Sequence, residues 1–196
     1  MIVNLHERDR ESLRDLVAQA EIFATQALMK VGHVPPTLLI QTSEGREMFS
    51  PQTLSDERSK EHFAATAKLM CIAHRATAAV FVAEGWTRFA KDGEALDLTK
   101  MPSQCADRQE VLMLMGEAWQ ATSQKLLPIM RSASGKFVGL GEAHKLDADT
   151  VKGRFAQFLP EKFPSLEDQE EAKELLNKVV KEVRRERGQE RGHARF

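Results

Sequence analysis

The stretch of sequence that decides the fold spans residues 76–86 and reads Ala-Thr-Ala-Ala-Val-Phe-Val-Ala-Glu-Gly-Trp. It carries no charge before Glu84 and consists largely of alanine, valine and phenylalanine. A short apolar run without alternating polar residues is typical of a strand that is buried on both faces. We therefore expect this strand near the centre of a β-sheet.

Further strands are predicted on both sides of this central strand. A hairpin precedes it, with strands at 37–42 and 46–49 around a turn that contains a glycine. A meander of three strands follows it, at 111–120, 125–131 and 136–143. Because most of these strands follow one another without a helix between them, we expect antiparallel pairing.

Four helices complete the predicted order of elements. They are expected at residues 8–30, 55–76, 148–159 and 166–188, where apolar residues recur at intervals of three and four. The predicted fold class is α+β: a single domain with a mostly antiparallel sheet of about six strands and helices packed mainly on one face. Pro128 cannot donate to a strand ladder, so its strand is expected at a sheet edge or bulged there.

The length and charge of the chain restrict its function. The sequence has 196 residues, and 28 Lys and Arg balance 29 Asp and Glu to give a formal net charge of −1. A strongly basic nucleic-acid-binding protein and an acidic tail protein are therefore disfavoured. We expect one folded domain over residues 1–183 and a flexible basic tail over 184–196. Without a recognisable leader or an apolar run of roughly 20 residues, we expect a cytoplasmic protein that does not contact a membrane.

Three segments share a pattern in which an apolar strand ends in a glutamate beside a glycine. The glutamates are Glu84, Glu117 and Glu142, and His144 follows the last of them. If the strand ends lie side by side, the carboxylates could bind a divalent cation through oxygen or divide acid and base roles. The alternative is that these strands simply end in polar residues where the sheet meets water, with antiparallel neighbours ending at opposite edges.

Cys71 and His74 form a second candidate pair, because a spacing of three residues places them on one face of a predicted helix. A structural zinc site needs four ligands, and the sequence offers no second pair of this kind. A Cys–His nucleophile would need the imidazole to point at the thiol. An ordinary buried cysteine beside a partly buried histidine is the commoner arrangement. We predict no cofactor beyond a candidate divalent cation.

The segment 181–196 carries six Lys or Arg residues against three Glu. A basic segment of this kind can contact the phosphates of a nucleic acid, and the candidate contacts are Arg184, Arg185 and Arg187. It can equally be a solvated helix end, whose cations suit the negative end of the helix dipole.

The Glu-Gly-Trp sequence at 84–86 and the Asp-Arg-Gln-Glu-Val sequence at 107–111 resemble a group of uncharacterised bacterial proteins. In that group a strand ends in Glu-Ala-Trp, and an Asp-Arg-x-Glu-Val strand follows a loop that contains proline. The resemblance covers about residues 60–145, and this chain departs from it by its glycine at position 85. The resemblance implies no established activity. It marks four residues for testing: Glu84, Trp86, Asp107 and Arg108.

The leading functional hypothesis is a non-catalytic protein that works by binding a protein partner or by self-association as a homodimer. It rests on the lack of a recognisable catalytic or cofactor motif and on Met113 and Met115, whose strand provides either an adaptable surface or plain core. Trp119 is a further interaction candidate. The alternatives are a metal-assisted hydrolase that uses the strand-end glutamates with His144, and a protein that contacts nucleic acid through its basic tail.

Overall fold

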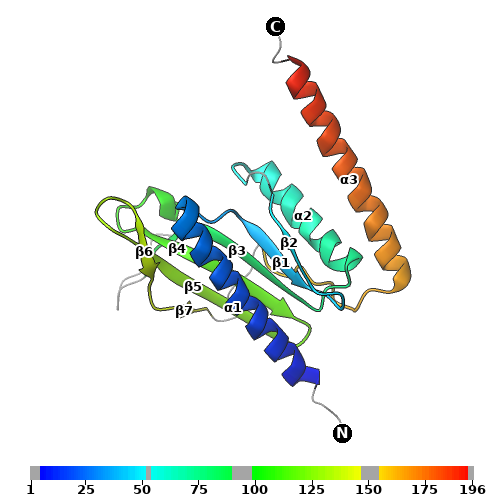
Figure 1. The fold of residues 1–196 in the computed structure, drawn as a ribbon, viewed down its shortest axis with the longest axis horizontal. Helices are drawn as coiled ribbons and strands as arrows, with labels where there is room; N and C mark the ends of the chain where they lie inside the picture. Colours follow the sequence, from blue (N-terminus) through cyan, green and yellow to red (C-terminus); the bar gives the residue numbers. More distant parts are fainter. Residues whose placement is uncertain (1–4, 52–53, 90–98, 147–154, 194–196) are drawn as a thin grey trace.

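The described residues form one antiparallel sheet with α-helices on both sides (Figure 1). The structure is a computed structural model that describes residues 5–51, 54–89, 99–146 and 155–193; at 5–6, 180 and 182–193 it describes the backbone alone. The elements follow in the order α1 (Leu5–Val31), β1 (Thr37–Gln41), β2 (Arg46–Phe49), α2 (Glu57–Ala73), β3 (Ala78–Thr87), the 3-10 helix η1 (Pro102–Gln104), β4 (Gln109–Ala118), β5 (Ala121–Arg131), β6 (Phe137–Leu140), β7 (His144–Lys145) and α3 (Leu166–His193).

The central position of β3 organises the sheet. The strand order is β2-β1-β3-β4-β5-β6, and β7 also pairs with β5. β3 pairs antiparallel with both β1 and β4, so Val80 stands opposite Leu39 on one side and Gly116 on the other. The α+β class, the antiparallel sheet, the hairpin and the meander are all confirmed.

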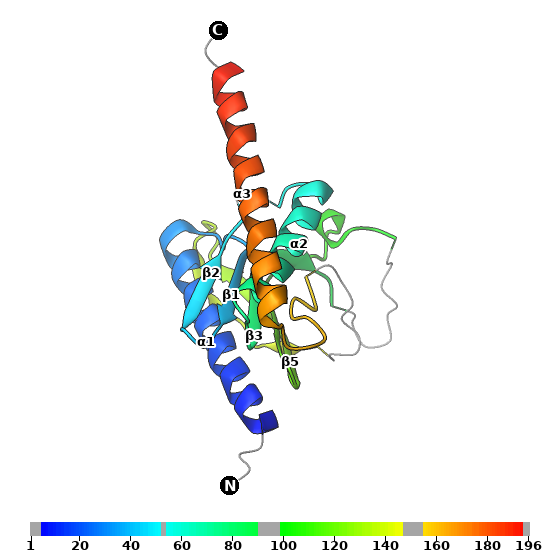
Figure 2. The same ribbon diagram turned by 90° about the vertical axis from the view of Figure 1, so that its right-hand side faces the viewer.

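Two hydrophobic clusters lie on opposite faces of β3, because successive side chains of a strand point to opposite sides. Val80 and Val82 face α1, where Leu16 is completely buried. Phe81 faces α2 and packs against Phe63. α3 lies on the outer side of α2 (Figure 2). The helices thus lie on both faces of the sheet, and our expectation that they pack mainly on one face is corrected: β3 is apolar on both sides and needs cover on both.

Local capping explains where α1 ends and α2 begins. α1 ends at Val31, because the next residue, Gly32, adopts a φ of +80° and donates its N–H to the carbonyl of Leu28 at 3.1 Å. α2 begins with a capping box in which Asp56 Oδ1 accepts the N–H of Ser59 at 2.7 Å. The cap is thus Asp56, directly before the first helical residue, Glu57.

α3 is longer than the sequence indicated. Ser165 caps its start, because its Oγ accepts the N–H of Asp168 at 3.1 Å. The helix runs to His193, so the backbone of residues 184–193 is helical where we expected a flexible tail. None of the helices in the described part of the chain is long and apolar enough to cross a lipid bilayer.

The helix expected at 148–159 is not found in the part of it that the structure describes. Residues 155–159 form turns and bends instead of a helix, and 147–154 lie outside the described residues. Phe155, Phe158 and Leu159 still pack against the α2 side of the sheet, as their apolar character indicated. The segment is therefore held by its side chains rather than by helical hydrogen bonds.

Pro128 lies inside β5, which is not an edge strand because β4 flanks it on one side and β6 and β7 on the other. In an antiparallel ladder, the N–H and C=O of one residue point to the same neighbour. The carbonyl of Pro128 accepts the N–H of Gly141 at 2.7 Å, and Gly141 lies between β6 and β7. The side of Pro128 that lacks an N–H therefore faces the break between β6 and β7. The edge prediction was wrong, and the irregularity lies nearby, between Met130 and Arg131.

Because β3 is buried on both faces, we expect truncation of its side chains to lower the free energy of unfolding more than truncation in the other strands. Phe81 is 1% exposed, and its ring lies 4.7 Å from that of Phe155 and 5.6 Å from that of Phe63 between centroids. We expect Phe81→Ala to lower the free energy of unfolding by about 3–5 kcal/mol and Phe81→Leu by less. Val138→Ala, at a residue that is 65% exposed, should change it by less than about 0.5 kcal/mol.

Urea titrations followed by circular dichroism measure these changes, with the midpoint shifting at an unchanged slope. If Phe81→Ala prevents folding, Phe81→Leu still reports the same core. A cost below about 1 kcal/mol for Phe81→Ala would contradict the two-sided burial of β3.

Candidate interaction site

Trp86 and Arg108 form an exposed stack at one end of the sheet. Trp86 is the next-to-last residue of β3 and is 45% exposed. The guanidinium carbon of Arg108 lies 4.7 Å from the centroid of the indole ring, which is within the range of a cation–π contact. Arg108 Nη1 also donates to the carbonyl of Ser103 in η1. The guanidinium group thus joins the indole ring of β3 to the turn that precedes β4.

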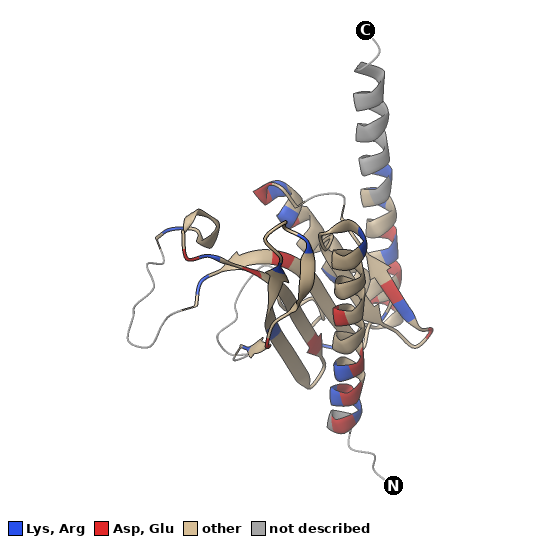
Figure 3. Ribbon diagram, turned by 60° about the vertical axis from the view of Figure 1, so that its left-hand side comes forward, with Lys and Arg blue, Asp and Glu red and all other residues tan. Residues whose placement is uncertain are grey.

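A carboxylate–guanidinium pair holds this segment to the end of β3. Arg88 Nε lies 2.8 Å from Oδ1 of Asp107 and 2.9 Å from Oδ2. The last rung of the β3–β4 ladder joins Thr87 to Gln109, so the pair lies immediately beyond it. Charged residues of both signs occupy the chain around η1 and the adjoining strand ends (Figure 3). Asp107 therefore fixes the position of the neighbouring Arg108.

An ionic network supports the stack from the α1 side of the sheet. Arg131 donates through Nε and Nη2 to the two carboxylate oxygens of Glu110, at 2.7 Å each. Glu84 Oε1 accepts the N–H of Val34 at 2.7 Å and lies 4.0 Å from Arg131 Nη2. Glu110 is the ladder partner of Trp86. The network joins three strands to the segment after α1, so Trp86 stands on a fixed base.

Arg131 faces both carboxylates of this network, Glu110 and Glu84. Burial raises the pKa of Glu84, and the nearby charge of Glu110 adds to this effect, while the Val34 N–H and Arg131 oppose it. The hydrogen bonds from Arg131 to Glu110 raise the pKa of the guanidinium above its ordinary value. By contrast, no carboxylate of the described residues pairs with Arg108. Arg108 is thus the cation of this site that can take an external anion.

The strand-end glutamates do not converge. Glu84 stands opposite Leu112 and Glu117 opposite Ala79, five ladder positions apart, which corresponds to about 17 Å along the strands. Glu84 also lies on the α1 face, whereas Glu117 lies on the α2 face with Met113. The convergence of Glu84 and Glu117 is therefore not found, and the alternative drawn from the sequence holds for this pair, because antiparallel neighbours end at opposite edges.

The other two members of the hydrolase hypothesis are exposed. Glu142 lies between β6 and β7, and His144 begins β7 with its ring 4.3 Å from that of Phe89 between centroids. Within the described residues, no three histidine, cysteine, aspartate or glutamate side chains are grouped to hold a metal ion. Within the described ranges, the strand-end glutamates and His144 thus do not form the cation site that the sequence suggested.

Glu117 has a structural role that the sequence pattern did not reveal. Its Oε1 accepts the N–H of Phe158 and, at 2.8 Å, that of Leu159. It thereby fixes the segment 155–159 to the sheet, beside a cavity of about 90 Å³ that also borders Gln124. Burial raises the pKa of Glu117, while the two N–H groups and the charge of Lys68 lower it by less.

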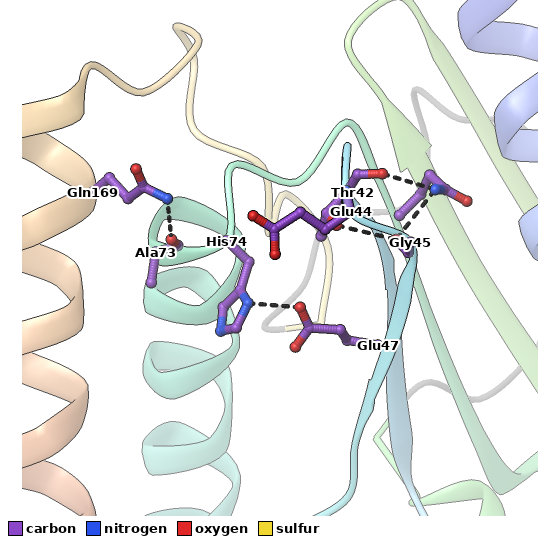
Figure 4. A network of polar contacts seen from close by, with 8 residues as sticks. Thr42, Glu44, Gly45, Glu47, Ala73, His74 and Gln169 are labelled. Atoms are coloured by element: carbon purple, nitrogen blue, oxygen red, sulfur yellow. Dashed lines mark hydrogen bonds and ion pairs between the residues drawn. The ribbon is translucent and has the colours of Figure 1, made fainter.

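Cys71 and His74 do not act as a pair. Cys71 is completely buried, and burial, with a smaller effect of the Glu117 charge, raises the pKa of its thiol far above the ordinary value. His74 points elsewhere: its Nδ1 lies 2.8 Å from Oε1 of Glu47 on β2 (Figure 4). Beside it, Gln169 of α3 donates to the carbonyl of Ala73 at 2.8 Å (Figure 4). His74 therefore belongs to the contact of α2 with β2, whereas Cys71 lies in the core on the α2 side of the sheet, where burial disfavours its thiolate.

The remaining candidates lie apart from the Trp86–Arg108 stack. Trp119 follows the opposite end of β4, half-buried, with its ring 5.6 Å from that of Phe163 between centroids. Met113 and Met115 pack against the α2-side core, which is the plain-core alternative of the sequence prediction. The structure does not describe the side chains of the tail arginines Arg184, Arg185 and Arg187. Their contact with nucleic acid therefore stays a prediction.

Comparisons of the chain with models of protein families, with curated proteins and with solved structures find no match. The resemblance noted in the sequence therefore stays a prediction. Of the residues it marked, the structure brings Glu84, Trp86, Asp107 and Arg108 to one end of the β3–β4 pair. Sequence reasoning missed Arg88 and Arg131, whose partners lie 19 and 21 residues away in the chain.

Glu117 provides a test of how the segment 155–159 is held. Glu117→Ala leaves the partly buried N–H groups of Phe158 and Leu159 without this acceptor, and we expect it to lower the free energy of unfolding by at least about 2 kcal/mol. Glu117→Gln keeps an oxygen acceptor, and we expect a change within about 1 kcal/mol at pH 7. Thermal and urea denaturation of the three proteins measure both effects.

The pH dependence has a defined sign. Because the folded state raises the pKa of Glu117, the folded protein binds this proton more readily than the unfolded chain. The contribution of Glu117 to stability is therefore greatest below the ordinary glutamate pKa and falls as the pH rises through the raised value. The free energy of unfolding of the wild type minus that of Glu117→Gln should therefore decrease as the pH rises through that window. An increase of this quantity with pH would contradict a raised pKa of Glu117 in the folded protein.

Proposed function

We propose that the chain is a non-catalytic protein-binding module that takes an acidic segment of a partner protein at the Trp86 surface. This surface consists of the exposed Trp86 ring, the Arg108 guanidinium stacked on it, and the adjoining turn from Met101 to η1. The observation that carries the proposal is that Arg108 is stacked and fixed in place while no described carboxylate neutralises it.

The composition of the surface supports this proposal. Tryptophan and arginine are the residue types most enriched among the energetically dominant positions of protein interfaces, and methionine is enriched in interfaces generally. Met101 is 67% exposed, next to η1, which packs beside β3. The guanidinium group can donate to a carboxylate while its face remains on the indole ring. The ionic network of Arg131 keeps the surface ordered before binding, which reduces the entropy lost on association.

The experiment is a fluorescence titration of the full chain carrying Trp119→Phe, in which Trp86 is the remaining tryptophan. The probe is a hexaglutamate peptide, and hexaglutamine serves as the uncharged control. We expect a saturable change of Trp86 fluorescence with hexaglutamate and none with hexaglutamine. Arg108→Gln should weaken binding at least tenfold, about 1.4 kcal/mol, because it removes a charge-assisted contact.

Arg58→Gln is the matched control, since Arg58 is exposed near the start of α2 and its loss changes the net charge by the same amount. It should leave the affinity unchanged. Equal weakening by Arg108→Gln and Arg58→Gln, or the same response to both peptides, would contradict the proposed function.

A further inference from the structure

A groove of about 660 Å³ lies between α2 and α3, on the side of α2 that faces away from the sheet. It is formed by the second half of α2, the segment 160–164 and the first half of α3. Its apolar lining comes from both helices and from two prolines between them: Leu69, Ile72, Pro160, Pro164, Ala172 and Leu175. Leu175 is 39% exposed, so apolar surface of this groove faces solvent.

The rim of the groove is acidic. Three carboxylates border it, from Glu161, Asp168 and Glu171, against the single ammonium group of Lys162. Asp168 caps α3 through Ser165 and remains ionised, because those hydrogen bonds lower its pKa. An apolar floor with an acidic rim fits a segment that is basic and carries some apolar side chains.

The chain itself contains such a segment. Residues 184–196 carry five arginines against two glutamates, a net charge of +3, and end in Ala-Arg-Phe. The groove and this segment are thus complementary in charge, and Phe196 offers an aromatic side chain for the apolar floor.

The segment cannot reach the groove of its own chain. α3 is one continuous helix, and residues 184–193 lie about 14–27 Å beyond Leu175 along its axis. Both views show α3 extending past α2, away from the rest of the molecule (Figures 1 and 2). The three residues after His193 span at most about 11 Å, too little to return to the groove. Occupation of the groove by this segment therefore requires two chains.

We propose that residues 184–196 of a second copy of this chain occupy the groove between α2 and α3. The exchange is reciprocal, since each copy offers one acidic groove and one basic segment, so a two-fold axis closes the assembly at two chains. The contact gives the second half of α3 a partner, which an isolated helix of this length and polarity needs in water. This inference is independent of the Trp86 surface.

The first measurement is the mass of the full chain in solution by light scattering, with salt held at 50 mM and then at 500 mM. We expect about twice the 22.0 kDa of one chain at low salt and dissociation at high salt, because the contact is largely ionic. A full-length neutral-tail variant, in which the five arginines of 184–196 are glutamine, should be monomeric at both.

The second measurement places the contact. A synthetic peptide of residues 184–196 is titrated into the neutral-tail variant, and we expect saturable binding. Adding Glu161→Lys and Glu171→Lys should weaken it at least tenfold. The matched control adds Glu170→Lys and Glu174→Lys, which lie on α3 outside the groove lining and change the net charge equally. A monomeric full chain at low salt, no peptide binding, or equal weakening by both pairs would overturn the proposal.

Discussion

The two-sided burial of β3 is the constraint on which the rest of the structure depends. Its six residues from Ala78 to Ala83 are all buried, with Val80 and Val82 toward α1 and Phe81 toward α2. An apolar strand of this kind cannot lie at an edge or face water on one side, because each exposed side chain would forfeit about 1.5–3 kcal/mol of burial. It therefore requires strands on both edges and helices on both faces, which is the arrangement observed.

The candidate site follows from the point where this burial ends. After Ala83, β3 continues for four residues that are partly exposed, and β4 runs beside them in register. Alternation then brings Glu84, Trp86 and Glu110 to the α1 side, where the chain after α1 supplies the N–H of Val34. The buried part of the ladder thus fixes the positions of polar groups at its end, where Arg108 stacks on the ring of Trp86.

Much of the fold could be predicted from the sequence because its signals are local. Each of these signals depends on residues that lie close together in the chain: the apolar run at 76–86, the apolar stripe of α1 and the capping residues of α3. The distribution of the helices could not be read in this way, because it depends on which alternate residues of β3 each helix covers. Glu84 and Glu117 show the same limit. They lie in similar local sequences, yet their side chains lie on opposite faces of the sheet, and only the register of the β3–β4 ladder reveals this. Arg131 was missed because its partner Glu110 lies on a neighbouring strand.

Amide hydrogen exchange followed by NMR tests the central role of β3 most directly. We expect the amides of Val80, Phe81 and Val82 to exchange only through global unfolding, with an opening free energy equal to that from urea denaturation. The amides of β2, at the edge of the sheet, should exchange through local opening at a lower free energy. Exchange of the β3 amides as fast as those of β2 would contradict the account, because the strand would then not be the most protected part of the fold.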